Sequence, residues 1–502
     1  MQHEAQICLL LEGTYPYVRG GVSSWLHQLI EGLPELSFSL VFIGGRRADY
    51  GKAHYRLPHN VVHLEAHYLE DSLRESSGRR AHMSPRRAQD AREFHVALQA
   101  MAAGRVCPHA PPLIDRVLRE LERPGGLSLE QFLYSPGAWE ILCDGHLQLD
   151  RDSSFIDYFW TLRWLHAPIF QLAKLVDQVP EAAVYHSIST GYAGFLGALL
   201  ERRRQRPLIL SEHGIYTKER RIDLNQAEWL SGGAPEHVLS DPSAPLRQLW
   251  VRYFESLGRL AYRSADPIVA LFEGSRQLQV AAGAAPERTR VIKNGIDAAA
   301  FHRALSARPA STPPVIGLVG RVVPIKDVKT FVRAIGVVAE TVPEVQGWVF
   351  GNTDEDPRYA EECRALVRSL GLGGRVHFFG HRALDEILPR LGVLMSSSIS
   401  EGQPLVVLEA FAAGVPCVVT DVGACRELIE GGDAEDRALG SAGRVVPFAD
   451  ARALGQAALE LLTQPETWQA CQFAGLRRVR HHYAHAAMLD AYRALYRAAL
   501  GA

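Results

Sequence analysis

Two glutamates in the stretch "SISEGQPLVVLEAFAAGVP", Glu401 and Glu409, stand eight positions apart after the strand-like run "VLMSSS". This order predicts Glu401 in a loop and Glu409 on the following helix. Backbone N–H groups at a helix start bind anions, and a carboxylate two turns further in accepts two hydroxyl bonds, as from a ribose. The junction is formed by Gly402, Gln403, Pro404 and Leu405. The alternative is two solvated carboxylates on a helix surface.

Two cations follow another apolar strand in "VGRVVPIKDVKTF", at Arg321 and Lys326. Both lie in a loop that enters a helix. A guanidinium fork and an ammonium five residues apart can bracket a diphosphate. Solvated loop cations are the alternative, and Gly320 before the pair weighs against it.

A glycine pair occurs in "YVRGGVSSW", at Gly20 and Gly21, between a predicted strand and a predicted helix. Glycines at this position let backbone N–H groups approach an anion near the helix start. Ser23 or Ser24 is the expected N-cap. A tight turn without a ligand is an equally good interpretation.

Two histidines, His186 in "VYHSIS" and His213 in "LILSEHGIY", lie at or just after predicted strands. Each alone is as consistent with a structural role as with a site, but two histidines at adjacent strand ends favour a site. Asn294–Gly295 requires only a turn. The pair Asp354 and Asp356 matches a D-x-D metal pattern, but a solvated loop is favoured, and no other cluster has metal-ligand spacing.

Strands alternate with helices along most of the chain, which predicts an α/β protein with parallel sheets. Its 502 residues exceed one core. We expect a first doubly wound domain at 1–300 with a helical insertion at about 66–180, and a second at 301–480. A final helix, 481–502, would return to the first domain.

The composition excludes several classes of protein. A net charge of −2 argues against nucleic acid as a partner. The seven cysteines show no C-x-x-C pair, as expected of reduced thiols. The start "MQHEAQICLLLEGTYPYV" lacks a basic region before its apolar run, so a signal peptide is not predicted. No apolar run reaches the ~20 residues of a membrane span.

The segments "GRVVPIKDVKTF", "HFFGH" and "EGQPLVVLEAFAAGVPCVVTDVGACREL" resemble family 4 of the retaining glycosyltransferases. The resemblance covers most of 186–480 and implies the GT-B fold, two Rossmann-like domains facing across a cleft. Within that family, "LLLEGTYPYVRGGVSSWLHQLIEGLPE" and the helical insertion look most like the cytosolic transferase of Pel exopolysaccharide synthesis.

The resemblance also implies a role for each candidate residue. Arg321 and Lys326 would hold the donor diphosphate, and Glu401 with the 402–405 amides would contact the donor sugar. Glu409 would bind the ribose, and the backbone near His381 would face the base. On the first domain, Gly20 and Gly21 would close on the phosphates and His213 would contact the sugar. The candidates for the acceptor side are Arg19, His186 and Tyr216.

These roles describe retaining transfer of a hexosyl unit from UDP-glucose or a UDP-N-acetylhexosamine to a growing polysaccharide, without a metal or other cofactor. Gln403 departs from the aromatic or small residue of many relatives, so it is where donor choice is expected. Inner-membrane synthase components are the expected partners, and the location would be cytoplasmic or peripheral at the inner membrane face. An epimerase, a phosphorylase and a non-catalytic nucleotide-sugar-binding scaffold remain alternatives.

Overall fold

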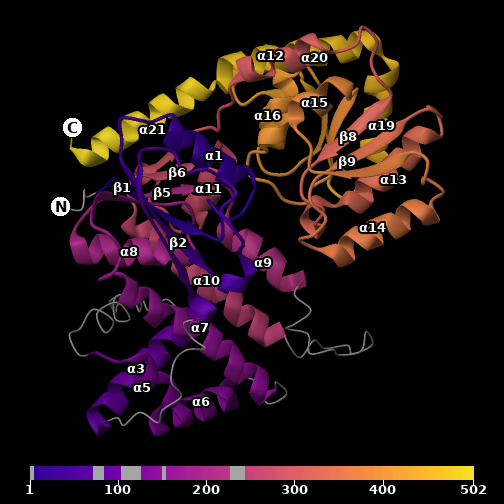
Figure 1. Ribbon diagram of the computed structural model, residues 1–502. Helices are drawn as coiled ribbons and strands as arrows, with labels where there is room; N and C mark the ends of the chain where they lie inside the picture. Colours follow the sequence, from indigo (N-terminus) through magenta and orange to yellow (C-terminus); the bar gives the residue numbers. More distant parts are fainter. Residues whose placement is uncertain (1–4, 72–83, 103–125, 150–153, 227–243, 502) are drawn as a thin grey trace. The chain divides into compact units, whose positions relative to one another are not determined.

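The computed structural model describes residues 5–71, 84–102, 126–149, 154–226 and 244–501 (Figure 1). The chain divides into two compact units. The first comprises Met1–Ala270, Arg276–Val291 and Ala494–Ala502, and the second comprises Leu271–Ser275 and Ile292–Arg493.

A seven-stranded parallel sheet organises the first unit, in the order β3-β2-β1-β4-β5-β6-β7. Its strands are β1 (Ala5–Glu12), β2 (Phe38–Gly44), β3 (Val61–Tyr68), β4 (Ala182–Ser187), β5 (Leu208–Glu212), β6 (Ile268–Ala270) and β7 (Thr289–Val291). Its helices are α1 (Gly21–Glu31), α3 (Pro85–Ala102), α5 (Leu129–Tyr134), α6 (Pro136–Leu149), α7 (Phe155–Leu175), α8 (Tyr192–Arg204), α9 (Tyr216–Gln226), α10 (Ala244–Ser264) and most of α11 (Glu273–Ala281).

A six-stranded parallel sheet organises the second unit, in the order β10-β9-β8-β11-β12-β13. Its strands are β8 (Val315–Val319), β9 (Gln346–Phe350), β10 (Val376–Gly380), β11 (Val393–Ser396), β12 (Cys417–Thr420) and β13 (Gly443–Val446). Its helices are α12 (His302–Ser306), α13 (Val328–Ala339), α14 (Pro357–Ser369), α15 (Leu384–Ile387), α16 (Leu405–Ala412), α17 (Cys425–Glu430), α18 (Ala434–Arg437), α19 (Ala451–Thr463), α20 (Pro465–His482) and most of α21 (His485–Leu500).

Both faces of the second sheet are buried. Val418 of β12 belongs to one hydrophobic cluster, while its neighbours Cys417 and Val419 belong to another. Successive side chains of a strand point to opposite faces, so the sheet separates two cores. This burial explains why its strands read as continuous apolar runs, and the α/β prediction with parallel sheets is confirmed.

Each sheet has one point at which the chain reverses the direction in which strands are added. In the first unit this point lies between the hydrogen-bonded neighbours β1 and β4, and in the second between β8 and β11. Loops leaving the carboxyl ends of such a pair diverge, and ligands of doubly wound folds bind in the crevice between them. These two places are therefore the first to inspect for a site.

Two local findings qualify the sequence predictions. Helix α1 begins at Gly21 with Gly20 as its N-cap and has no side-chain cap, so the expected cap at Ser23 or Ser24 is wrong. Ser23 is instead buried within the helix. Among the described helices, none combines the length and apolar character needed to cross a bilayer.

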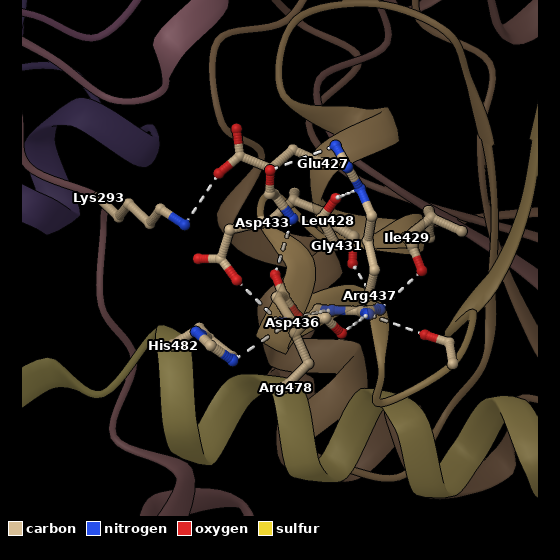
Figure 2. A network of polar contacts seen from close by, with 12 residues as sticks. Lys293, Glu427, Leu428, Ile429, Gly431, Asp433, Asp436, Arg437, Arg478 and His482 are labelled. Atoms are coloured by element: carbon tan, nitrogen blue, oxygen red, sulfur yellow. Dashed lines mark hydrogen bonds and ion pairs between the residues drawn. The ribbon is translucent and has the colours of Figure 1, made fainter.

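A buried ion pair fastens α20 to the chain around α18 (Figure 2). Arg478 and Asp436 both have side chains with 0% exposure, and Arg478 Nε donates to Asp436 Oδ1 at 2.5 Å. The remaining guanidinium protons reach the carbonyl oxygens of Leu428, Ile429, Asp436 and Gly440. The second carboxylate oxygen accepts from the backbone N–H of Gly432. The pair is thus hydrogen-bonded on all sides, the condition under which a buried charge is tolerated.

Replacing Arg478 should be strongly destabilising. Arg478→Met leaves the Asp436 charge buried without its cation, which should lower the free energy of unfolding by about 3–5 kcal/mol. Urea denaturation measures this change. Arg426→Met is the control, because Arg426 pairs with Asp421 and Glu430 on the surface and should cost under about 1 kcal/mol. Equal effects for the two variants would contradict the structural role of Arg478.

Candidate functional site

A hollow of about 290 Å³ opens at the reversal point of the second sheet. It lies at the carboxyl ends of β8 and β11, the position that the topology indicates. Two charged side chains line it, Lys326 and Glu401. The remaining lining residues are aliphatic, sulfur-containing or serine: Leu318, Val319, Leu394, Met395, Ser396, Ser397, Ser398 and Val406.

Lys326 and Glu401 form an ion pair in which Lys326 Nζ donates to Glu401 Oε1. Their side chains are 23% and 13% exposed, so the pair is only partly screened by water. Ser398 Oγ donates to the same carboxylate oxygen at 2.7 Å. The structure therefore unites the two motifs that the sequence identified separately, and adds a serine that sequence reasoning missed. The run of three serines directly after a strand was the available signal.

The backbone around Lys326 is fixed by its neighbours. Pro324–Lys326 forms a single 3-10 turn, and Asp327 follows with φ 43°, in the left-handed region, and caps α13 by accepting from Thr330 N at 3.2 Å. Ser397 Oγ lies 2.9 Å from the carbonyl oxygens of both Lys326 and Asp327. A serine at the end of β11 therefore positions the lysine at the end of β8.

The loop that carries Glu401 is supported by the turn formed by Gly423 and Ala424. Ala424 N donates to Gly402 O at 2.8 Å. Gly423 has φ +57°, and a Cβ there would lie 2.2 Å from Glu401 O. Only glycine satisfies both the left-handed conformation and this close approach. Gly423 is thus a further site-forming residue that the sequence motifs did not single out.

Glu409 lies on α16, as predicted, but its carboxylate has no partner among the residues that the structure describes. It is half-buried, and no described residue forms a hydrogen bond or ion pair with its side chain. Burial raises the pKa of its carboxyl group to about 7. The position on the helix was predicted, and the described part of the chain supplies no partner for the carboxylate.

Arg321 is not brought into the hollow. It follows β8 and pairs with Glu355, and both side chains are more than 40% exposed. The proposal that Arg321 and Lys326 bracket one diphosphate stays a prediction. His381 is exposed in the loop after β10.

Gln403 is buried beside Asn294 and does not line the hollow. It is 5% exposed, and its Oε1 accepts from Asn294 N at 2.7 Å. The interpretation of Asn294–Gly295 as a turn alone was incomplete, because Asn294 is 3% exposed and bonded to this loop. A direct contact between Gln403 and a sugar remains untested.

The D-x-D pair has a structural explanation for one of its members. Asp356 caps α14, with Oδ1 accepting from Tyr359 N at 2.9 Å, while Asp354 is exposed. Within the part of the chain that the structure describes, no three His, Cys, Asp or Glu side chains gather as a metal site would require.

The candidate residues of the first unit lie around the carboxyl end of its sheet. Arg19, Gly20 and Gly21 are exposed before and at the start of α1. His213 directly follows β5, and its ring centroid lies 4.1 Å from that of Trp25. Burial lowers the pKa of His213 to about 3, so the ring is neutral, and no described group bonds to its Nε2.

His186 is saturated by protein contacts. It is fully buried within β4, with Nδ1 2.7 Å from Tyr496 Oη and Nε2 2.9 Å from Ser211 Oγ. Burial lowers its pKa to about 3. This arrangement favours the structural alternative for His186 over a contact with an acceptor.

Tyr216 belongs to a cluster centred on Glu12, at the end of β1. Tyr216 Oη donates to Glu12 Oε1 at 2.6 Å. Ser189 Oγ and Ala193 N each lie 3.1 Å from Glu12 Oε2, and Ala193 is in the first turn of α8. The reversal point of the first sheet therefore contains a carboxylate of the chain itself, at the helix start where an external anion would otherwise bind.

Comparison with known proteins identifies the chain. Residues 5–287 match the model described as a domain of unknown function (DUF3492), which is more than half of the chain. The chain belongs to this family. Residues 313–464 match the model described as glycosyl transferases group 1.

Two of the similar proteins are a sugar-phosphate synthase and a mannosyltransferase. The alpha-maltose-1-phosphate synthase of Mycolicibacterium smegmatis is 28% identical over 54% of this chain and 69% of its own length. The lipopolysaccharide core biosynthesis mannosyltransferase LpsB of Rhizobium meliloti is 30% identical over 39% of this chain and 56% of its own length.

Solved structures share the fold at low sequence identity. HepE of Anabaena, solved with UDP-glucose, has a TM-score of 0.59 and 14% identity over 98% of this chain and 99% of its own. Sucrose-phosphate synthase of Thermosynechococcus elongatus has a TM-score of 0.58 and 18% identity over 99% of both chains. The chain is a glycosyltransferase with the GT-B fold, as the sequence predicted.

The raised pKa of Glu409 predicts a pH-dependent stability difference. The folded protein holds this proton up to about pH 7, against an ordinary value of 4.5, so wild-type stability should fall as the pH rises between these values. Glu409→Gln removes the ionisation. Its melting temperature should equal that of wild type near pH 5 and exceed it at pH 8, as measured by differential scanning calorimetry.

Glu460→Gln is the control, and its melting temperature at pH 8 should change in the opposite direction. Arg444 holds the pKa of Glu460 below its ordinary value, so the ionised carboxylate stabilises the fold and its loss should lower the melting temperature at pH 8. A Glu409→Gln difference that does not change between pH 5 and pH 8 would contradict the burial argument.

Proposed function

We propose that the protein is a retaining, metal-independent transferase that moves a hexosyl unit from a UDP-sugar to a polysaccharide acceptor. The observation that carries this proposal is the Lys326–Glu401 pair in the hollow of the second sheet. A cation and a carboxylate side by side provide one group for a diphosphate and one for sugar hydroxyls. HepE, with the same fold, was solved with UDP-glucose.

The contrast between the two reversal points supports donor binding in the second unit. In the first unit, Glu12 already accepts bonds from Ala193 N, Ser189 and Tyr216. Arg220 Nη2 also lies 3.8 Å from Glu12 Oε1, so the donors and the cation at this position already serve a carboxylate of the chain itself. In the second unit, Lys326 offers a cation beside an open hollow.

Donor binding would require Lys326 to exchange partners. In the protein alone its charge is balanced by Glu401. A diphosphate would compete for the ammonium group, and the released Glu401 could then accept bonds from donor-sugar hydroxyls. Lys326, with Arg321 as the second predicted cation, would stabilise the charge that develops on the leaving phosphate.

Transfer would follow front-face substitution. The acceptor oxygen would form its bond to the anomeric carbon on the side from which the phosphate leaves, and the acceptor proton would pass to the departing phosphate oxygen. Lys326 and backbone amides near the start of α16 would supply the charge stabilisation that a metal supplies elsewhere. Glu409 would accept bonds from the ribose hydroxyls, which would give its carboxylate the partner that it lacks among the described residues.

The finer assignment rests on the resemblance of the N-terminal segment and on these groups. The protein would be a family 4 transferase of the PelF type, acting on UDP-glucose or a UDP-N-acetylhexosamine to build a Pel-type biofilm polysaccharide. It would work in the cytoplasm, with synthase components of the inner membrane as partners. A thermal-shift screen of UDP, GDP and ADP sugars tests the donor class, and a preference for GDP or ADP forms would refute the UDP assignment.

Exchange of partners at Lys326 makes opposite predictions for two variants. Lys326→Met should weaken UDP binding about 10- to 100-fold, the value of one charge-assisted hydrogen bond. Glu401→Gln should bind UDP as tightly as wild type or more tightly, because it removes the competing carboxylate, while transfer falls. Isothermal titration calorimetry with UDP and a transfer assay measure the two effects.

Lys329→Met is the matched control, since Lys329 pairs with Glu362 and does not line the hollow. It should bind UDP as wild type does. If Glu401→Gln weakened UDP binding as much as Lys326→Met, the competition between Glu401 and the diphosphate would be refuted.

Metal independence has a direct test. Transfer measured after dialysis against EDTA should stay within about twofold of the untreated enzyme, because a lysine rather than a divalent cation would balance the diphosphate. Inhibition that is reversed by added Mg²⁺ or Mn²⁺ would refute this part of the proposal and return attention to Asp354 and Asp356.

A further inference from the structure

The segment that enters the second unit is bonded to the loop that carries Glu401. After Val291 the chain passes from the first unit into the second, whose longer segment is Ile292–Arg493. Two residues after Ile292, Asn294 N donates to Gln403 Oε1 at 2.7 Å, across 109 positions of sequence. Both residues are buried, at 3% and 5% exposure. In a buried location this bond has no competition from water, and its loss would leave a polar group unsatisfied.

The 293–296 segment can anchor the Glu401 loop because its other residues are bonded to different parts of the second unit. Lys293 Nζ pairs with Glu427 of α17 at 2.9 Å (Figure 2). The same atom lies 5.1 Å from the centre of the Tyr483 ring. Ile296 N donates to Tyr483 O at 2.9 Å, and His485 N donates to Ile296 O at 3.1 Å. The segment 293–296 thus joins α17 and the chain after α20.

The same segment has no room to shift toward that chain. A Cβ at Gly295 would lie 2.7 Å from Ala484 O, so the two backbones are in direct contact. The Glu401 loop is held on its other side by Ala424 N, which donates to Gly402 O. The loop is therefore fixed between the 293–296 segment and the turn that precedes α17.

We propose that Gln403 is a positioning residue for Glu401. It anchors the donor-sugar loop to the 293–296 segment, so that Glu401 meets Lys326 and Ser398 in one geometry. This inference rests on the proposed function of that loop. The sequence predicted donor choice at Gln403; this proposal gives the residue a role through Glu401, because its side chain is buried and is not among the residues that line the hollow.

The two ends of the Gln403 amide differ, which makes the proposal specific. Oε1 accepts the 2.7 Å bond, whereas no described group bonds to Nε2. The acceptor must be the oxygen, because the donor is a backbone N–H. The second contact, Asn294 Nδ2 to Gln403 O, is long at 3.5 Å. The oxygen of Gln403 should therefore matter, and its nitrogen and the Asn294 side chain should matter little.

Three variants of the full chain test whether the oxygen of Gln403 matters more than the Asn294 side chain. Gln403→Met keeps the shape and removes the acceptor. It should bind UDP within about threefold of wild type but lose about 10- to 100-fold in kcat, the effect of a misplaced sugar-binding group. Gln403→Glu restores an oxygen and should recover most of that kcat. Asn294→Ala keeps the backbone donor and should have wild-type kcat.

Amide hydrogen exchange of the 292–296 peptide, followed by mass spectrometry, tests the anchor without reference to activity. Exchange should be slow in wild type, Gln403→Glu and Asn294→Ala, and faster in Gln403→Met. Equal exchange in wild type and Gln403→Met would overturn the anchor. UDP binding lost in step with kcat would overturn the positioning role in favour of a general structural one, and unchanged kcat in Gln403→Met would also overturn it.

Failure of the proposed function would appear differently. Wild-type protein would then bind no UDP and transfer no sugar, and the positioning role would fall with it. The exchange pattern of the four proteins would still decide whether Gln403 anchors the 293–296 segment.

Discussion

The pairing of Lys326 with Glu401 is the constraint on which the arrangement of the second unit depends. The side chain of Lys326 is only 23% exposed, so its ammonium group is stabilised by a nearby counter-charge that water screens only partly. The chain supplies this counter-charge as a carboxylate from the next strand's loop, with Ser398 as a further donor to it. The loops that follow β8 and β11 must lie close together for this ion pair to form. The residues that hold them there are Ser397, Asp327, Gly423 and Gln403.

The first unit solves the corresponding problem in the opposite way. The reversal point of the first sheet also lies beside the N-terminus of a helix, α8. The partial positive charge of the backbone N–H groups there favours an anion. Here the chain supplies its own anion, Glu12, and packs it so closely that a Cβ at Gly191 would lie 2.6 Å from Glu12 Oε2. One topology used twice thus gives one occupied and one open position. The difference lies in side chains, not in the fold.

The parts of this picture that follow from periodicity could be predicted, and those that depend on a single distant contact could not. Apolar runs indicated buried parallel strands, and parallel strands bring their carboxyl ends together, which is why Lys326 and Glu401 could be expected near each other. The bond from Asn294 to Gln403 spans 109 positions, and the contact of His186 with Tyr496 spans 310. No local pattern encodes such pairs. Arg321 shows the same limit, because its partner Glu355 belongs to a different loop.

The electrostatic surroundings of Glu401 and Glu409 differ. Glu401 already contacts a cation and a hydroxyl donor before any ligand arrives. Glu409 experiences burial alone, and its pKa rises to about 7. Near neutral pH it is divided between a neutral form and a destabilised charged form. A ligand whose two hydroxyl groups donate hydrogen bonds to Glu409 would stabilise the charged form. Binding would then offset the free energy of desolvation that the folded protein carries at this carboxylate. In this sense the less stable carboxylate is the better prepared of the two for a ligand.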